Sequence, residues 1–93
     1  MEYFLYIIQS VADSSYYVGY THDLRLRLEH HNAGWTMSTK AKRPWKIVYS
    51  ERCASKSDAI RREAYIKRMK SRTYIESLIR NAGGRPDPTK GSP

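Results

Sequence analysis

Two short runs of apolar, aromatic and β-branched residues lie near the start of the chain, with a polar segment between them. The runs cover residues 3–8 and 16–20, and the polar segment is Ala-Asp-Ser-Ser at 12–15. Aromatic and β-branched residues favour strands, whereas small polar residues of this kind favour turns. The pattern therefore predicts a β-hairpin.

Successive side chains of a strand point to opposite faces, so the two runs also predict which residues share a face. Tyr6 shares a face of the first strand with Ile8, and Tyr17 shares a face of the second strand with Gly19. Pairing of the strands is expected to bring the hydroxyl groups of both tyrosines to one patch. Gly19 would leave room there, because a strand residue without a Cβ atom often marks a close approach.

A helix is predicted directly after the hairpin, over residues 24–32. Asp23 is placed to cap its N-terminus, and Gly34 is placed to close it. His31 falls on the apolar stripe of this helix, and Arg27 lies one turn before it at the border of the stripe. The helix therefore presents a cation and an imidazole beside its buried face.

The rest of the chain predicts one more strand and two more helices. Alternation over residues 45–50 indicates a third strand. Residues 55–58 match the capping-box pattern and open a helix that runs to about residue 70. Ser71 is expected to cap a last helix that ends near residues 81–84. Residues 33–44 have no periodicity and are interpreted as a basic surface loop.

These elements predict an α/β (α+β) domain over residues 1–81, in the order ββαβαα. We expect a small, mainly antiparallel sheet of three strands, with the Tyr6 strand in the centre and three helices flanking it. Residues 82–93 contain three prolines and no large apolar side chain, so they predict a disordered tail.

The excess of basic residues indicates the class of binding partner. The 93 residues suit one domain, and 17 Lys plus Arg against 9 Asp plus Glu give a formal net charge of +8. Such a charge favours a polyanionic partner, nucleic acid above all, although a generically basic surface would give the same balance.

Cysteine content and hydropathy restrict the class of protein further. Cys53 is the single cysteine, which excludes an intramolecular disulfide and a zinc cluster built from thiolates. No apolar run approaches the roughly 20 residues that span a bilayer, and no targeting segment is evident. We therefore expect a monomer in the reducing environment of the cytoplasm, without membrane association.

Glu63 is the most informative single position. It lies at or beside the apolar stripe of the predicted helix after residue 55, where a carboxylate needs a partner. The partner is either one of the many arginines, in a salt bridge, or a divalent cation such as Mg²⁺. Tyr6, Tyr17, Arg27 and His31 each have an ordinary structural interpretation when taken singly. Together with Glu63 they are the parts needed to hydrolyse a phosphodiester.

At these positions the sequence resembles the GIY-YIG nuclease family. Phe-Leu-Tyr at 4–6 stands where the family has Gly-Ile-Tyr, and Tyr-Val-Gly at 17–19 stands where it has Tyr-Ile-Gly. Arg27 and His31 match the arginine and histidine of the family's first helix, and Glu63 matches its metal-binding glutamate. The first glycine of the motif is absent here. The similarity extends over most of the chain, and it is strongest to small, stand-alone members.

The resemblance implies a metal-dependent DNA endonuclease, and it is compatible with structure specificity and a link to DNA repair or recombination. Glu63 would hold a single Mg²⁺ or Mn²⁺ ion, and Arg27 would bind the scissile phosphate. One of the tyrosines, Tyr6 in preference to Tyr17, would activate the attacking water, and His31 would orient a tyrosine or contact the phosphate. Flanking phosphates are expected to meet a set of basic residues that position the DNA without reading its sequence. This set is Lys40, Lys42, Arg43, Arg62 and Lys67.

Two other functions stay open at this point. The first is a catalytically silent module that binds nucleic acid through the same basic face and its aromatic residues. The second is a nuclease subunit that is active only with a protein partner, which would supply the DNA binding that larger members of the family obtain from separate domains.

Overall fold

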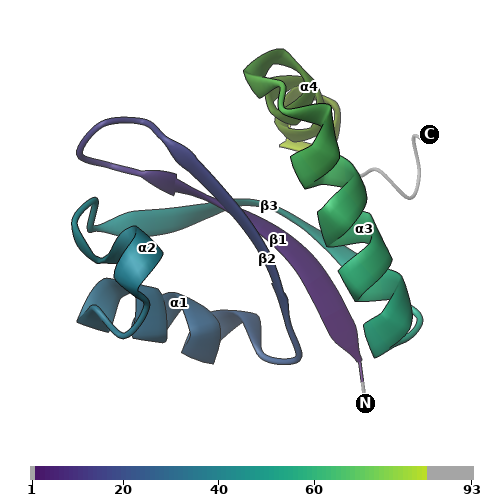
Figure 1. Cartoon of the computed structure of the whole chain (residues 1–93), viewed down its shortest axis with the longest axis horizontal. Coiled ribbons are helices and arrows are strands. Elements are labelled where there is room, and N and C mark those ends of the chain that lie inside the picture. Colours follow the sequence, from purple (N-terminus) through teal and green to yellow (C-terminus); the bar gives the residue numbers. More distant parts are fainter. Residues whose placement is uncertain (1, 84–93) are drawn as a thin grey trace.

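The strand that carries Tyr6 is the central strand of the sheet. In the computed structural model, which describes residues 2–83, the sheet has the order β2-β1-β3 and all pairing is antiparallel (Figure 1). Its strands are β1 (Tyr3–Ser10), β2 (Tyr16–Thr21) and β3 (Trp45–Cys53). The predicted hairpin and central strand are therefore confirmed, and β3 continues three residues beyond the predicted end at 50.

The register of the hairpin places Tyr6 and Tyr17 on the same face of the sheet. Tyr6 pairs with Gly19, and Ile8 pairs with Tyr17. Directly opposed residues lie on the same face of a sheet. Both tyrosines therefore belong to one face, as period-2 geometry predicts.

The helices begin at the residues that the capping patterns indicate. The Asp23 carboxylate accepts a hydrogen bond from the backbone N–H of Leu26, and the Ser55 hydroxyl accepts one from that of Asp58. The Ser71 hydroxyl likewise accepts from the N–H of Tyr74 at 3.0 Å. The three helices that follow these caps are α1 (Leu24–Ala33), α3 (Lys56–Met69) and α4 (Arg72–Gly83).

One additional helical turn, α2 (Met37–Lys40), lies where a surface loop is predicted. Thr39 on this turn is fully buried, and its carbonyl oxygen accepts a hydrogen bond of 2.8 Å from the indole N–H of Trp45. The interpretation of residues 33–44 as an exposed loop is therefore wrong at Thr39. A four-residue turn is too short for periodicity to reveal, and its burial depends on β3, which follows it in the chain.

Helices cover both faces of the sheet (Figure 1). On one face, Leu5, Ile7 and Val18 pack with Ile66 of α3, and residues of α4 adjoin this cluster. On the other face, Tyr6, Ile8 and Trp45 form a second cluster against leucines of α1. Within residues 2–83 no helix is long and apolar enough to cross a membrane. Most of the tail predicted over 82–93 lies outside the described residues.

Candidate active site

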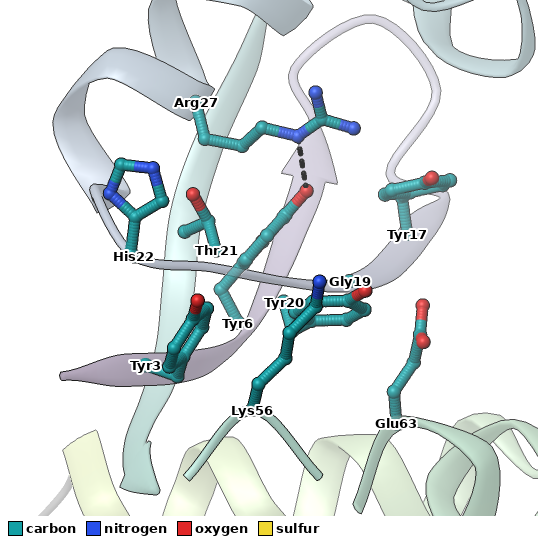
Figure 2. A pocket seen from close by; sticks show the side chains of 10 residues that line it. All are labelled: Tyr3, Tyr6, Tyr17, Gly19, Tyr20, Thr21, His22, Arg27, Lys56 and Glu63. Atoms are coloured by element: carbon teal, nitrogen blue, oxygen red, sulfur yellow. Dashed lines mark hydrogen bonds between the residues drawn. The ribbon is translucent and has the colours of Figure 1, made fainter. Parts of the chain in front are cut away.

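A polar cleft of about 370 Å³ lies over Gly19 of β2, between α1 and α3. In Figure 2, Lys56 and Glu63 rise from α3 on one side of the cleft, Arg27 comes from α1 on the other, and Tyr6 lies between them. The full lining consists of Tyr3, Tyr6, Tyr17, Gly19, Tyr20, Thr21, His22, Arg27, Lys56 and Glu63. Residues that are far apart in the sequence are thus brought to one place.

Gly19 makes room for the Tyr6 side chain. A Cβ atom at residue 19 would lie 2.6 Å from the Tyr6 hydroxyl oxygen and 2.8 Å from Cζ, which is closer than real Cβ contacts come. Tyr6 is 2% exposed, so its side chain is packed on nearly all sides. The absent side chain at residue 19 therefore determines where the Tyr6 hydroxyl lies.

The Tyr6 hydroxyl is held between two side chains of α1. It lies 2.8 Å from Nε2 of His31, and it accepts a hydrogen bond of 3.2 Å from Nε of Arg27. Arg27 and His31 are four residues apart, so they lie on the same side of the helix, one turn from each other. The four-residue spacing of Arg27 and His31 therefore lets both side chains contact the same hydroxyl group.

The proton positions in this network follow from a third residue, Thr39. Its hydroxyl donates to the Thr36 carbonyl at 3.3 Å, and the same oxygen lies 2.8 Å from Nδ1 of His31. With its single hydroxyl proton assigned to the Thr36 carbonyl, Thr39 is assigned as the acceptor of a hydrogen bond from Nδ1–H of His31. A neutral His31 then carries a free lone pair on Nε2, which accepts the proton of the Tyr6 hydroxyl.

Burial sets the charge state of this network. It lowers the pKa of His31 to about 4, and the charges of Arg27 and His30 act in the same direction. His31 is therefore neutral at pH 7. Burial also raises the pKa of Tyr6, although the hydrogen bond and charge of Arg27 oppose the shift. In the free protein the proton stays on Tyr6.

Glu63 faces this network from α3. Its side chain is 21% exposed and its Oε2 atom lies 3.0 Å from Nζ of Lys67, which also sits over the ring of Tyr17 at 5.6 Å from the centroid. Glu63 is the one acidic residue in the lining of the cleft within the described part of the chain. A salt bridge is therefore present, but its partner is a lysine and not one of the arginines expected from the sequence, and the carboxylate also opens into a polar cleft.

The residues of the cleft fit a hard divalent cation that takes few of its ligands from the protein. Over residues 2–83 there is no group of three or more His, Cys, Asp or Glu side chains that could enclose a metal ion. Mg²⁺ is commonly held by one or two carboxylates, with water and substrate phosphate completing its shell. Glu63 is the residue that would hold such an ion here, in place of its contact with Lys67.

None of the five basic residues predicted to contact DNA is part of the cleft lining. Lys67 lies beside the cleft, paired with Glu63, whereas Lys40, Lys42 and Arg43 lie at and after α2. Lys42 also has a partner, because its Nζ atom lies 3.7 Å from Asp13.

Arg62, the remaining member of the predicted set, is held elsewhere. Its Nε and Nη2 atoms donate to Glu51 of β3 at 2.8–3.1 Å. Arg62 is therefore engaged within the fold, and it is not among the residues that line the cleft.

Several lining residues are not among those predicted from the sequence. Lys56 precedes Glu63 by seven residues, which is two helical turns, so the same periodicity that points to Glu63 would have found it. Tyr20, Thr21 and His22 directly follow Gly19, and only the strand pairing places them in the cleft. Thr39 is not a lining residue, and nothing in the sequence around it indicates its contact with His31.

The fold and the cleft together define the class of protein. Residues 2–75 match the GIY-YIG catalytic domain, which is the domain of a nuclease family. The chain belongs to the GIY-YIG family and, within it, to the group of small UPF0213 proteins.

Three UPF0213 proteins show how similar this chain is to the group. A UPF0213 protein of Streptococcus pneumoniae serotype 4 is 40% identical over 79 residues, which cover 84% of this chain and 79% of that protein. The UPF0213 protein YazA of Bacillus subtilis is 36% identical over 78 residues, covering 80% of this chain and 78% of YazA. The solution structure of the UPF0213 protein BH0048 from Bacillus halodurans superimposes with a TM-score of 0.59 at 32% identity, covering 96% of this chain and 94% of that one.

Proposed function

We propose that this protein is a metal-dependent endonuclease that hydrolyses phosphodiester bonds of DNA in the cleft over Gly19. One observation carries the proposal: the Tyr6 hydroxyl is fixed between the acceptor nitrogen of His31 and the guanidinium of Arg27, opposite the carboxylate of Glu63. A module that only binds DNA has no use for a carboxylate facing the phosphate. A role in DNA repair or recombination would suit such an activity.

Arg27 is the residue that would bind the scissile phosphate. Its Nε atom is occupied by Tyr6, while its two terminal nitrogens point away from that hydroxyl (Figure 2). The remaining N–H donors suit phosphate oxygens, which accept hydrogen bonds readily from a guanidinium. Lys56 adds a second positive charge on the opposite side of the cleft, so a phosphate between them is attracted from both sides.

Tyr6 would act as the general base through His31. As the water oxygen bonds to phosphorus and the bond to the leaving oxygen breaks, the water proton passes to Tyr6, and the Tyr6 proton passes to Nε2 of His31. Negative charge from the phosphate offsets the Arg27 cation that helps to lower the pKa of His31, which favours this transfer. Tyr17, whose ring packs edge-on to His31 with centroids 5.1 Å apart, would position the water or the phosphate.

A divalent ion at Glu63 would supply Lewis-acid stabilisation of the charge that develops on the phosphate and the leaving oxygen. Lys67 would be displaced from Glu63 by the ion and would be free to meet a flanking phosphate. The protein's own contribution is therefore to hold the phosphate, the water and the ion in a fixed relation.

The test is cleavage of end-labelled linear, flapped and branched DNA with Mg²⁺, with Mn²⁺ and with EDTA. We expect metal-dependent cutting that Glu63→Gln and Tyr6→Phe abolish, because they remove the carboxylate and the transferable proton. Arg61→Gln is the matched control, since Arg61 lies on the same helix but pairs with Asp58 outside the cleft. A wild-type protein that binds these DNAs and cuts none of them would overturn the proposal for the protein alone, and a partner-dependent subunit would then be sought.

A further inference from the structure

Trp35 presents a large aromatic surface to solvent beside α1. Its side chain is 70% exposed, whereas the other tryptophan, Trp45, is 4% exposed. One face of the Trp35 ring is covered by His30, with the ring centroids 4.0 Å apart and the planes within 14° of parallel. The indole is therefore held in place on one side and open on the other.

Two cationic side chains lie against Gly34, the residue directly before Trp35. A Cβ atom on Gly34, the residue before Trp35, would lie 2.9 Å from Nη1 of Arg43 and 3.5 Å from Cγ of Lys40, so both side chains lie against that glycine. Neither cation is paired with a carboxylate in the part of the chain that the structure describes. Their charges are available to a polyanion.

The surface that carries Trp35 is continuous with the candidate active site. His30 lies three residues after Arg27 on α1, which is about 4.5 Å along the helix axis. Both residues line a hollow of about 200 Å³ together with Thr21 and His22, which also line the cleft. A strand whose phosphate lies at Arg27 would therefore pass His30 on its way to Trp35.

An exposed aromatic ring with unpaired cations close to it in the fold is an arrangement with which proteins bind single-stranded nucleic acid. Bases stack on the ring and phosphates meet the cations. In a duplex each base already stacks on its neighbours, so only an unpaired base can offer its face to an indole. We infer that Trp35 stacks on an unpaired base of the DNA strand that is cut, so that the substrate has a single-stranded segment next to the scissile phosphate. The position of that phosphate at Arg27 rests on the proposed function.

Tryptophan fluorescence in EDTA tests the stacking without any need for cleavage. An oligothymidylate is titrated into the protein, and an abasic oligonucleotide of the same length serves as a probe with the same phosphates and no bases. We expect the oligothymidylate to quench the emission of Trp35 while the buried Trp45 keeps its own, and the abasic strand to leave both unchanged.

The variant Trp35→Leu should lose this quenching and bind the oligothymidylate about tenfold more weakly, the effect of one stacked base. Its affinity for the abasic strand should not change. Tyr65→Leu is the matched control, because Tyr65 is also an exposed aromatic with cations close to it, Arg62 and Arg68, but lies away from the cleft. It should leave both affinities as they are.

Three outcomes would overturn the inference: equal quenching by the abasic strand, unchanged affinity of Trp35→Leu for the oligothymidylate, or no binding of the oligothymidylate at all. These outcomes do not depend on catalysis. Loss of stacking with retained cleavage would reject the inference alone, and stacking without cleavage would reject the proposed nuclease alone.

Discussion

The Oγ1 atom of Thr39 lies 2.8 Å from Nδ1 of His31, and both side chains are fully buried. With the Thr39 hydroxyl donating to the Thr36 carbonyl, this contact assigns the imidazole proton to Nδ1. It thereby leaves Nε2 free to accept from Tyr6, although Thr39 is not part of the cleft lining and lies on a single helical turn.

Thr39→Val should therefore reduce cleavage without touching any residue of the cleft. The substitution removes the acceptor for Nδ1–H, so we expect about a tenfold or larger loss of the single-turnover rate and a loss of about 1–3 kcal/mol in the free energy of unfolding. Nitrogen-15 NMR of His31 should show the tautomer population shifting, whereas Thr39→Ser should keep both the tautomer and the rate. An unchanged tautomer in Thr39→Val would show that Thr39 does not set it.

The neutral state of His31 should make the fold sensitive to acid. The pKa of His31 is about 4 in the folded protein against 6.5 for an unperturbed histidine, so the unfolded chain takes up the proton first as the pH falls. The stabilisation is complete above pH 6.5 and is lost as the pH falls toward 4, which amounts to about 2 kcal/mol between pH 7 and pH 5.

Urea unfolding at a series of pH values measures this loss. His31→Gln should flatten the dependence over that interval, whatever its effect at neutral pH, because glutamine does not titrate. His22→Gln, at an exposed histidine, should keep the wild-type slope. A wild-type slope in His31→Gln would place the acid sensitivity in another group.

Comparing Gly19→Ala with a second destabilising variant should distinguish the effect of displacing Tyr6 from the effect of lost stability. The new Cβ atom would meet the Tyr6 hydroxyl oxygen at 2.6 Å, so we expect a cost of about 1–3 kcal/mol and loss of cleavage as the phenol is displaced. Gly34→Ala is the control, since φ of +86° at Gly34 makes it destabilising by about 1–2 kcal/mol as well. At saturating DNA, Gly34→Ala should still cut at the wild-type rate, and equal loss of the rate in both variants would refute the role of Gly19.

The parts of the fold that sequence patterns predict are those decided locally. The hairpin and the caps at Asp23, Ser55 and Ser71 depend on residues within a few positions of one another, and all are confirmed. The turn around Thr39 is different, because it forms only when Trp45 of β3 and His31 of α1 come to it.

The candidate site shows the same division. Tyr6, Tyr17, Arg27 and Glu63 are brought to one cleft, with His31 directly behind Tyr6. Positive charge alone predicts the DNA-contacting residues less well. A basic side chain can pair with a carboxylate of the fold or remain available to DNA, and the residues that face it decide which. No local pattern reveals that Glu51 of β3 faces Arg62, since the two residues meet only when α3 packs on the sheet.

Arg62 should therefore prove structural and not a DNA contact. Both oxygens of Glu51 accept from its guanidinium, and although burial alone would raise the pKa of Glu51, the hydrogen bonds from Arg62 and Tyr49 keep it low. Arg62→Gln leaves this half-buried carboxylate short of a partner, so we expect a loss of about 1–3 kcal/mol in the free energy of unfolding. The double variant Glu51→Gln/Arg62→Gln should recover part of that loss, because the stranded charge is then absent.

The salt dependence of DNA binding distinguishes the two roles of a basic residue. A lysine that neutralises a phosphate contributes about 0.7 (single strand) to 0.9 (duplex) to the slope of log affinity against log salt, so Lys40→Gln should reduce the slope by slightly less than one. Arg62→Gln should leave the slope unchanged, because Glu51 already neutralises its charge. If Arg62→Gln reduced the slope as much as Lys40→Gln while the fold kept its full stability, Arg62 would be a phosphate contact after all, and its pairing with Glu51 would have to open when DNA binds.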